Sequence, residues 1–584
     1  MAPAIPTYET VREEVSSEFE NVFQNKPVKF ATIREVKDIL SDHRLVELYN
    51  SLKPRKPGLF SRPQDEGTEL PATAERFLAL IKSKMLYEFL AVLLYAGCKQ
   101  RSVEAFVEKM VVGGQAKEQN KRDEKPYHLP QEIKNLDDLL GNFRDAKLFD
   151  NVQDLFCVMV IGSPDVVTIK AADKRTLPWH VDTTTKDPLG SNASSKVVKV
   201  IVSPYHLTED GNFSNTKPYE VPFARKSFIG ALEAKKNFDE ELQTLRKILS
   251  SYSQNKNILT SVAAIIEETN PPNFYLLMPL AETDLEHYLE EEREMGMALK
   301  TSLLKSATGL ADGLRFLHSG IRDGDEKYTC YHLDLKPANV LVFKDPLRSS
   351  TNHASDNYKR IWKISDFGIS RVKTMNTIDQ KQNDRFVDNL FQSQKQKTEQ
   401  EGASDTQNRR GLGQFLPPEA SSRKSEMNEK SDIWSLGCII SVLFTYMAYG
   451  SQGVKEYSQA RGGRNKFGVE RFWESAPFFK KSINRKVSMK HRELIGDALN
   501  RNDREAAALE PMLDFLDSRV LKIEKEKRCD AEEIYEQLKK TRKAYSAAQI
   551  SSAGNQYQPK PFARNSTGRY GTANYDVYPK TNFY

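Results

Sequence analysis

The chain has 584 residues, 39% of them hydrophobic, so it is several times longer than one compact core requires and two or more folded units are expected. Lysine and arginine total 86 against 80 acidic residues. A surplus of six positive charges is too small for a chain of this length to predict binding to the phosphate backbone of a nucleic acid. Nucleic-acid binding is therefore not expected.

The five cysteines are widely separated and have no CxxC or Cys/His spacing that would hold zinc, so we interpret them as reduced thiols. The first twenty residues lack a basic-then-apolar leader. The longest apolar run, Trp434–Gly450, is short for a membrane span and has no basic flanks, which favours a buried core helix. We expect an intracellular protein, cytoplasmic or nuclear, without a membrane span.

The first part of the chain has helical patterns. Residues 7–50 predict two helices, the second preceded by a capping-box pattern formed by Thr32 and Glu35. A stretch rich in proline, glycine and lysine separates them from an apolar helix expected at Ala74–Ala96. A polar linker follows, and residues 131–172 again carry apolar stripes that need a partner surface.

From about residue 175 the pattern changes to short β-branched runs mixed with helical spacing, which predicts a small sheet followed by helices. The last forty residues are polar and without apolar periodicity, which is typical of disorder. We predict a mostly helical N-terminal domain of unknown role at 1–172, a second domain at 175–542 and a disordered tail at 543–584.

The strongest motif is YHLDLKPANVLVF, in which His332, Asp334, Lys336, Pro337 and Asn339 have the spacing of a protein kinase catalytic loop. Each residue alone would be read as an ordinary surface group. Further motifs of that family follow in its order, and they are Asp366-Phe367-Gly368, Pro417-Pro418-Glu419, Asp432 and Arg528. The region 175–542 therefore resembles eukaryotic-type protein kinases, and its Lys-Pro pair is the Ser/Thr pattern.

This resemblance implies an α+β, bilobal protein kinase fold, in which a small β-rich lobe and a large helical lobe hold nucleotide between them, preceded by the helical N-terminal domain. It also implies ATP and Mg²⁺ as cofactors and protein substrates. By resemblance, Asp334 orients the substrate hydroxyl or accepts its proton, Lys336 contacts the γ-phosphate, and Asn339 and Asp366 bind Mg²⁺.

Upstream, VPFARKSF resembles the strand whose lysine contacts the α- and β-phosphates, here Lys226. We choose Glu241 rather than Glu240 as its partner because the following leucines take the family's apolar positions. Downstream, the resemblance pairs Glu419 with Arg528 and has Asp432 brace the catalytic-loop backbone. The residues that it assigns to the nucleotide pocket are Leu189, Gly190, Val197, Ala224, Lys226, Met278, Pro279, Ala281, Asp284 and Leu341.

The sequence departs from the family in the loop that usually covers the phosphates. The stretch LGSNASSKV keeps Gly190 and Val197 but has Asn192 and Ser195 in place of glycines. Since a side chain limits close approach of backbone amides to phosphate, we expect weakened nucleotide binding or turnover.

Leu333 replaces the arginine that usually precedes the catalytic aspartate, so control by a phosphate on the activation segment is expected to be absent. The segment from Asp366 to Glu419 is unusually long and polar, and Leu412 stands where Ser/Thr kinases commonly carry threonine.

Three functions are compatible with parts of this pattern. The first is an active Ser/Thr protein kinase whose helical domain binds a protein partner or restrains the catalytic domain. The second is a pseudokinase that acts as a binding or scaffolding module, which the altered phosphate loop favours and the retained catalytic residues oppose. The third, a small-molecule kinase, shares an HxD…N loop and a later aspartate, but the Lys-Pro pair in the loop, the Asp366-Phe367-Gly368 and Pro417-Pro418-Glu419 motifs and Asp432 oppose it.

Overall fold

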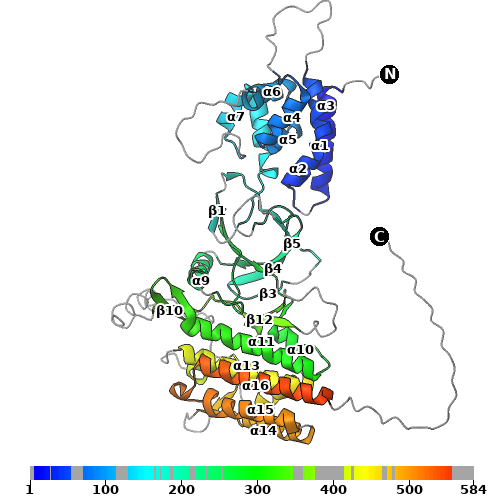
Figure 1. Ribbon diagram of the computed structural model, residues 1–584. Coiled ribbons are helices and arrows are strands. Elements are labelled where there is room, and N and C mark those ends of the chain that lie inside the picture. The colour runs from blue at the N-terminus through cyan, green and yellow to red at the C-terminus, as the bar shows by residue number, and fades with distance from the viewer. Residues whose placement is uncertain are drawn as a thin grey trace, which may run out of the picture.

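The computed structural model shows a helical unit, then a twisted sheet, then a larger helical lobe along one long axis (Figure 1). The expected disordered tail beyond residue 554, and residues 375–412 with Leu412, lie outside the described residues. The described residues are 6–26, 28–53, 70–112, 129–162, 166–170, 173–184, 188–208, 217–230, 233–251, 254–345, 359–374, 413–421, 427–462, 470–475, 481–501 and 503–554.

The N-terminal unit is built from short helices whose apolar faces meet in one core. Helix α5 is buried on nearly every side, as its almost wholly apolar sequence YEFLAVLLY requires. The helices are α1 Tyr8–Gln24, α2 Ile33–Ile39, α3 Asp42–Leu52, α4 Ala74–Ser83, α5 Tyr87–Tyr95, α6 Gln100–Phe106 with a π-helical continuation Val107–Val112, α7 Ile133–Leu140 and α8 Phe143–Asp150.

Two helix predictions in this unit are corrected. The capping box of Thr32 and Glu35 is confirmed, but the helix it starts ends at Ile39, and Ser41 caps a separate α3. The single helix expected at Ala74–Ala96 is broken between α4 and α5, where Met85 has a left-handed φ of 54°. These breaks let short segments turn their apolar faces toward the shared core, which overrides local helix propensity.

Glu88, on α5, is largely buried, and burial raises the pKa of its carboxyl to about 7 despite the positive charge of Lys37. A raised folded-state pKa contributes stability that is present below the unfolded value near 4.5 and is lost as pH rises through about 7. We expect Glu88→Gln to raise the free energy of unfolding by about 2 kcal/mol at pH 8, with the gain shrinking toward zero near pH 4.5.

Urea unfolding of the full chain at several pH values measures this gain, with the exposed Glu9→Gln on α1 as the control. An equal effect of Glu88→Gln at pH 4.5 and pH 8 would contradict the prediction.

The sheet has the order β1-β6-β7-β5-β4-β2, with β3 also paired to β4, and all pairs are antiparallel except β1 with β6. Helix α9, Glu233–Leu249, packs on it through Phe238, whose ring contacts those of Phe228 and Phe274. The strands are β1 Val166–Lys170, β2 Trp179–Val181, β3 Gly190–Ser191, β4 Ser195–Val202, β5 Val221–Phe228, β6 Ala263–Glu268 and β7 Asn273–Pro279.

Residues 157–162 and 166–170, which together we call the strap, lie between the helical unit and this sheet. Strand β1 pairs in parallel with β6, and the Ile161 amide donates to the His206 carbonyl at 2.8 Å. Ile161 and Ile169 are buried in a cluster with sheet residues such as Leu277, whereas the core of the helical unit ends at Phe156. The expected boundary at residue 172 is therefore wrong, because the strap completes the sheet rather than the helical bundle.

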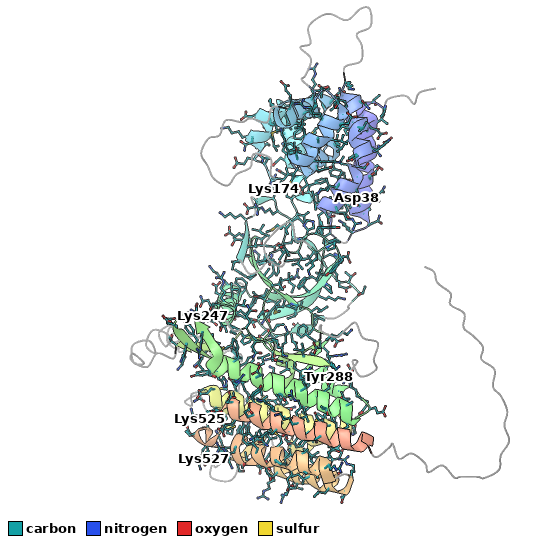
Figure 2. The ribbon with its side chains drawn as sticks, viewed as in Figure 1. Asp38, Lys174, Lys247, Tyr288, Lys525 and Lys527 are labelled. Atoms are coloured by element: carbon teal, nitrogen blue, oxygen red, sulfur yellow. The ribbon has the colours of Figure 1, made fainter. Side chains whose placement is uncertain are left out.

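The helical unit also contacts the sheet region beside the strap. Lys174, labelled at this junction in Figure 2, forms an ion pair with Asp150 at 2.6 Å. The guanidinium of Arg34 on α2 lies 5.9 Å from the centre of the Tyr205 ring. These contacts attach the helical unit to the side of the sheet that lies away from the larger lobe (Figure 1).

The large lobe consists mainly of helices, so the predicted α+β, bilobal fold is confirmed. Its elements are β8 Thr283–Asp284, α10 Leu285–Glu290, α11 Met297–Arg315 with a π-helical turn Phe316–Gly320, β9 Ile321–Asp323, β10 Glu326–Tyr331, the 3₁₀ turn Pro337–Asn339, β11 Val340–Lys344, β12 Arg360–Ile364, β13 Arg371–Thr374, the 3₁₀ turn Pro418–Ser421, α13 Glu429–Gly462, β14 Trp473–Ser475, β15 Lys481–Ile483, α14 Arg485–Arg501, α15 Asp503–Phe515 with a π-helical turn Leu516–Val520, the 3₁₀ turn Lys525–Lys527 and α16 Ala531–Gly554.

Two elements of this lobe bear on the sequence predictions. Helix α13 contains the apolar run Trp434–Gly450 and is long and apolar enough to cross a membrane, but most of that run is buried in the lobe, as expected for a core helix. Helix α16 continues to Gly554, so the expected start of the tail at residue 543 is wrong. The buried ring of Tyr545 anchors this last part of α16, which packs against α11.

Candidate active site

The catalytic-loop motif lies between β10 and β11, where Asp432 of α13 fixes its backbone. One carboxylate oxygen of Asp432 accepts from the His332 amide at 2.9 Å and the other from the Leu333 amide at 2.7 Å. Leu333 has a left-handed φ of 65°, an unfavourable conformation for a side-chain-bearing residue, so these bonds hold a strained turn. The bracing role predicted for Asp432 is confirmed.

Asp334 lies at the centre of the polar contacts of the loop. Its Oδ2 accepts from Lys336 Nζ at 2.9 Å and from Asn339 Nδ2 at 3.1 Å, and Asn339 Nδ2 also donates to the Asp334 carbonyl at 2.8 Å. Because the amide nitrogen of Asn339 faces Asp334, its amide oxygen is directed away from these contacts. The three residues predicted from the motif are therefore brought together.

His332 joins this loop to the end of β12. Its Nδ1 accepts from the Asp334 amide at 3.3 Å, so the proton is on Nε2, which donates to the Ser365 carbonyl at 2.9 Å. The Phe367 ring packs edge-on against the imidazole at 5.3 Å between centres. These contacts hold Asp366 beside the catalytic loop.

Lys226 of β5 bridges two carboxylates where the sheet borders the large lobe. Its Nζ lies 2.7 Å from Glu241 Oε2 on α9 and 2.8 Å from Asp366 Oδ1. The choice of Glu241 is confirmed, since Glu240 lies near Lys236 on a half-exposed part of α9 instead.

Burial alone would lower the pKa of Lys226, but the charges of Glu241 and Asp366 outweigh it and raise that pKa. Burial alone would raise the pKa of Asp366, but Lys226 lowers it. The charged forms of Lys226 and Asp366 are therefore favoured, whereas burial raises the pKa of Glu241 despite the nearby charge of Lys226. Gly368 allows this approach, because a Cβ there would lie 3.3 Å from a Glu241 carboxylate oxygen.

The register of the sheet aligns several of the residues assigned to the nucleotide pocket. Gly190 is opposite Val197, and Val197 is opposite Lys226, so these residues share one row across β3, β4 and β5. In a nearby row, Ala224 is opposite Met278. Leu189, just before β3, is largely exposed.

The remaining pocket residues lie at the connection between the lobes. Pro279 ends β7, Ala281 follows it half-buried, and Leu341 of β11 is opposite Asp284 of β8. The Asp284 carboxylate caps α10 by accepting from the His287 amide at 2.9 Å and its ring at 2.8 Å. A contact of Asp284 with ribose stays a prediction.

The pair predicted between Glu419 and Arg528 is confirmed as a buried, two-point ion pair. Arg528 donates from Nη1 and Nη2 to the two oxygens of Glu419 at 2.7 and 2.9 Å. This pair connects the segment that begins at residue 413 to the part of the large lobe just before α16.

The family model of the protein kinase domain matches residues 215–538, more than half of the chain. The chain belongs to the protein kinase family. Serine/threonine-protein kinase Nek2 of Homo sapiens is 28% identical to it over 218 residues, which are 35% of this chain and 36% of the relative. Nek2 of Mus musculus matches with the same identity and coverage. The chain thus spans about a third of the length of these curated relatives.

Sequence reasoning missed two features of this kinase domain. The first is the strap, although β-branched runs in LFCVMVI and VVTIK gave a strand signal there. The second is Asn192, which the motif comparison identifies only as a lost glycine but whose side-chain oxygen contacts both Ser194 and Ser195 in the turn between β3 and β4. An asparagine followed by small polar residues is a common turn-forming pattern and could have indicated it.

Proposed function

We propose that this chain is a Ser/Thr protein kinase that transfers the γ-phosphate of ATP to protein substrates. The observation that carries the proposal is the three-way contact of Lys226 with Glu241 and Asp366, beside the cluster of Asp334, Lys336 and Asn339. A protein kinase needs both sets of groups in place for phosphoryl transfer.

The chemistry of these residues fits ATP and Mg²⁺. The carboxylate of Asp366 and the amide oxygen of Asn339 are hard oxygen ligands of the kind that Mg²⁺ prefers, and Lys226 and Lys336 provide positive charge for phosphate oxygens. When bound, Mg²⁺·ATP supplies the transferable phosphoryl group and neutralises its charge. The residues Leu189, Gly190, Val197, Ala224, Met278, Pro279, Ala281, Asp284 and Leu341 complete the proposed nucleotide site.

In this proposal Asp334 orients the substrate hydroxyl and accepts its proton. The Lys336 ammonium lies 2.9 Å from that carboxylate and provides positive charge for the phosphoryl oxygens. Asn339 fixes the Asp334 backbone through its bond to the carbonyl. Because these side chains already contact one another, they need little rearrangement before the reaction.

The second candidate is a pseudokinase that acts as a scaffold. The altered phosphate loop and the replacement of arginine by Leu333 favour it, whereas the complete set of polar contacts around Lys226 and Asp334 favours catalysis. Assignment to the Ser/Thr class rests on the Lys-Pro pair and on the similarity to Nek2. A protein partner for the helical unit, and a cytoplasmic or nuclear location consistent with five free, buried cysteines, are part of the proposal.

We expect Asp334→Asn in the full chain to lower phosphate transfer from Mg²⁺·ATP by about 10²–10⁴-fold, because it removes the proton acceptor. The measurement is transfer of labelled γ-phosphate to a generic basic protein and to the chain itself. Asp325→Asn, on the exposed turn between β9 and β10, is the control and should leave transfer unchanged. Folded wild-type chain that binds ATP without transferring phosphate would favour the scaffold.

A further inference from the structure

The turn between β3 and β4 is closed by one side-chain oxygen. Asn192 Oδ1 accepts from the Ser194 amide at 2.9 Å and the Ser195 amide at 2.7 Å. The hydroxyls of the same two serines lie 3.0 and 3.1 Å from it. Four donors thus converge on one point, and only an acceptor oxygen can satisfy the two amides.

Successive backbone amides that converge in this way form a site that suits an anionic oxygen. In the proposed kinase site, this turn stands where backbone amides would meet phosphate, since Gly190 and Val197 flank it and Val197 is opposite Lys226. Here the neutral side-chain oxygen of Asn192, which belongs to the turn itself, accepts from the amides of Ser194 and Ser195.

Backbone hydrogen bonds also stabilise this turn. The Asn192 amide donates to the Ser195 carbonyl at 2.9 Å, and the Ile229 amide donates to the Ser194 carbonyl at 2.8 Å. The Asn192 side chain is exposed, so it can rotate outward without disturbing the core. The donors can therefore change acceptor while the hairpin persists.

We propose that Asn192 is an internal substitute for a phosphate oxygen, which occupies the amides of Ser194 and Ser195 and must be displaced when ATP binds. The inference rests on the proposed function of the site as an ATP site. It makes Asn192 a positioning residue that lowers ATP affinity by competition, beyond the simple loss of a glycine.

The experiment is titration calorimetry of the full chain with Mg²⁺·ATP and, separately, with adenosine, which lacks the phosphates. Asn192→Ala should bind ATP about three- to tenfold more tightly, the equivalent of about one net hydrogen bond, because the amides are no longer occupied. Asn192→Asp keeps the acceptor but adds negative charge where phosphate must enter, so ATP should bind more weakly. Adenosine affinity should stay unchanged in both variants.

The matched control is Asn273→Ala, which removes an asparagine side chain that bonds within the exposed hairpin between β6 and β7. It should change neither affinity. A purely structural role for Asn192 would give the opposite pattern, with Asn192→Ala weakening both ligands and Asn192→Asp resembling wild type, and that result would overturn the inference.

Two further outcomes separate this inference from the proposed function. Wild type and both Asn192 variants binding ATP equally would overturn the role of Asn192 and leave the ATP site in place. Wild type binding neither ATP nor adenosine would overturn both.

Discussion

A chain that begins at residue 175 should fail to fold, whereas one that begins at 157 should fold and keep the proposed nucleotide site. The first lacks the strap, so β6 becomes an edge strand and the hydrophobic cluster of the sheet loses Ile161 and Ile169. Each of these isoleucines contributes about 1.5–3 kcal/mol by burial, and the lost strand pairing adds to this. The sum is comparable to the whole stability of many domains, about 5–15 kcal/mol.

Circular dichroism and urea unfolding of the two truncated chains measure this difference. Point variants in the full chain test the same contact without truncation. Ile169→Asn puts a polar group into the cluster and should lower the free energy of unfolding of the kinase part by about 2–4 kcal/mol. Thr168→Asn, on the exposed face of the same strand, should change it little. Equal stability of the chains from 157 and from 175 would refute the strap as part of the sheet.

Arg528→Met should destabilise the large lobe by about 3–5 kcal/mol, because removing one partner of a buried ion pair leaves the other uncompensated. The Arg528 side chain is fully buried, and besides its two bonds to Glu419 it donates to the carbonyls of Lys522 at 2.8 Å and Lys430 at 2.9 Å. The loss of this side chain would leave these acceptors without their donor.

The control for this variant is Arg519→Met. Arg519 pairs with Glu533 at the same 2.7 Å distance, but both side chains are about half exposed, so this substitution should cost at most about 1 kcal/mol. Urea unfolding of the full chain compares the two variants, and similar costs would contradict the importance of burial.

The Glu419 pair also has a defined pH dependence. Burial alone would raise the pKa of Glu419, but the hydrogen bonds and charge of Arg528 outweigh burial and lower that pKa. The stability from this pair is therefore present above the unfolded pKa near 4.5 and is lost as pH falls through the lowered folded value. The difference between Arg528→Met and wild type should shrink in acid.

The sequence by itself was sufficient for the catalytic loop, the Lys226–Glu241 pair, the bracing by Asp432 and the fold class. Short motifs at fixed offsets, such as Asp334 to Asn339, could be recognised in the sequence, and the resemblance to protein kinases that they carry implied the fold and these pairings. The choice between Glu240 and Glu241 could be made because Leu242 and Leu245, which follow them, take the apolar positions of the protein kinase family.

Only the tertiary structure decided where the kinase domain begins, where the N-terminal helices break and which group accepts from the backbone amides in the turn at Asn192. The strap pairs with β6, a strand about a hundred residues further along the chain, and no local pattern identifies so distant a partner. The apolar helix pattern is continuous, but the helix breaks at Met85, so that α4 and α5 run in different directions and both bury apolar side chains in the shared core. Burial in that core outweighs helix propensity. In each case the deciding free energy comes from surfaces that meet only after the chain has folded.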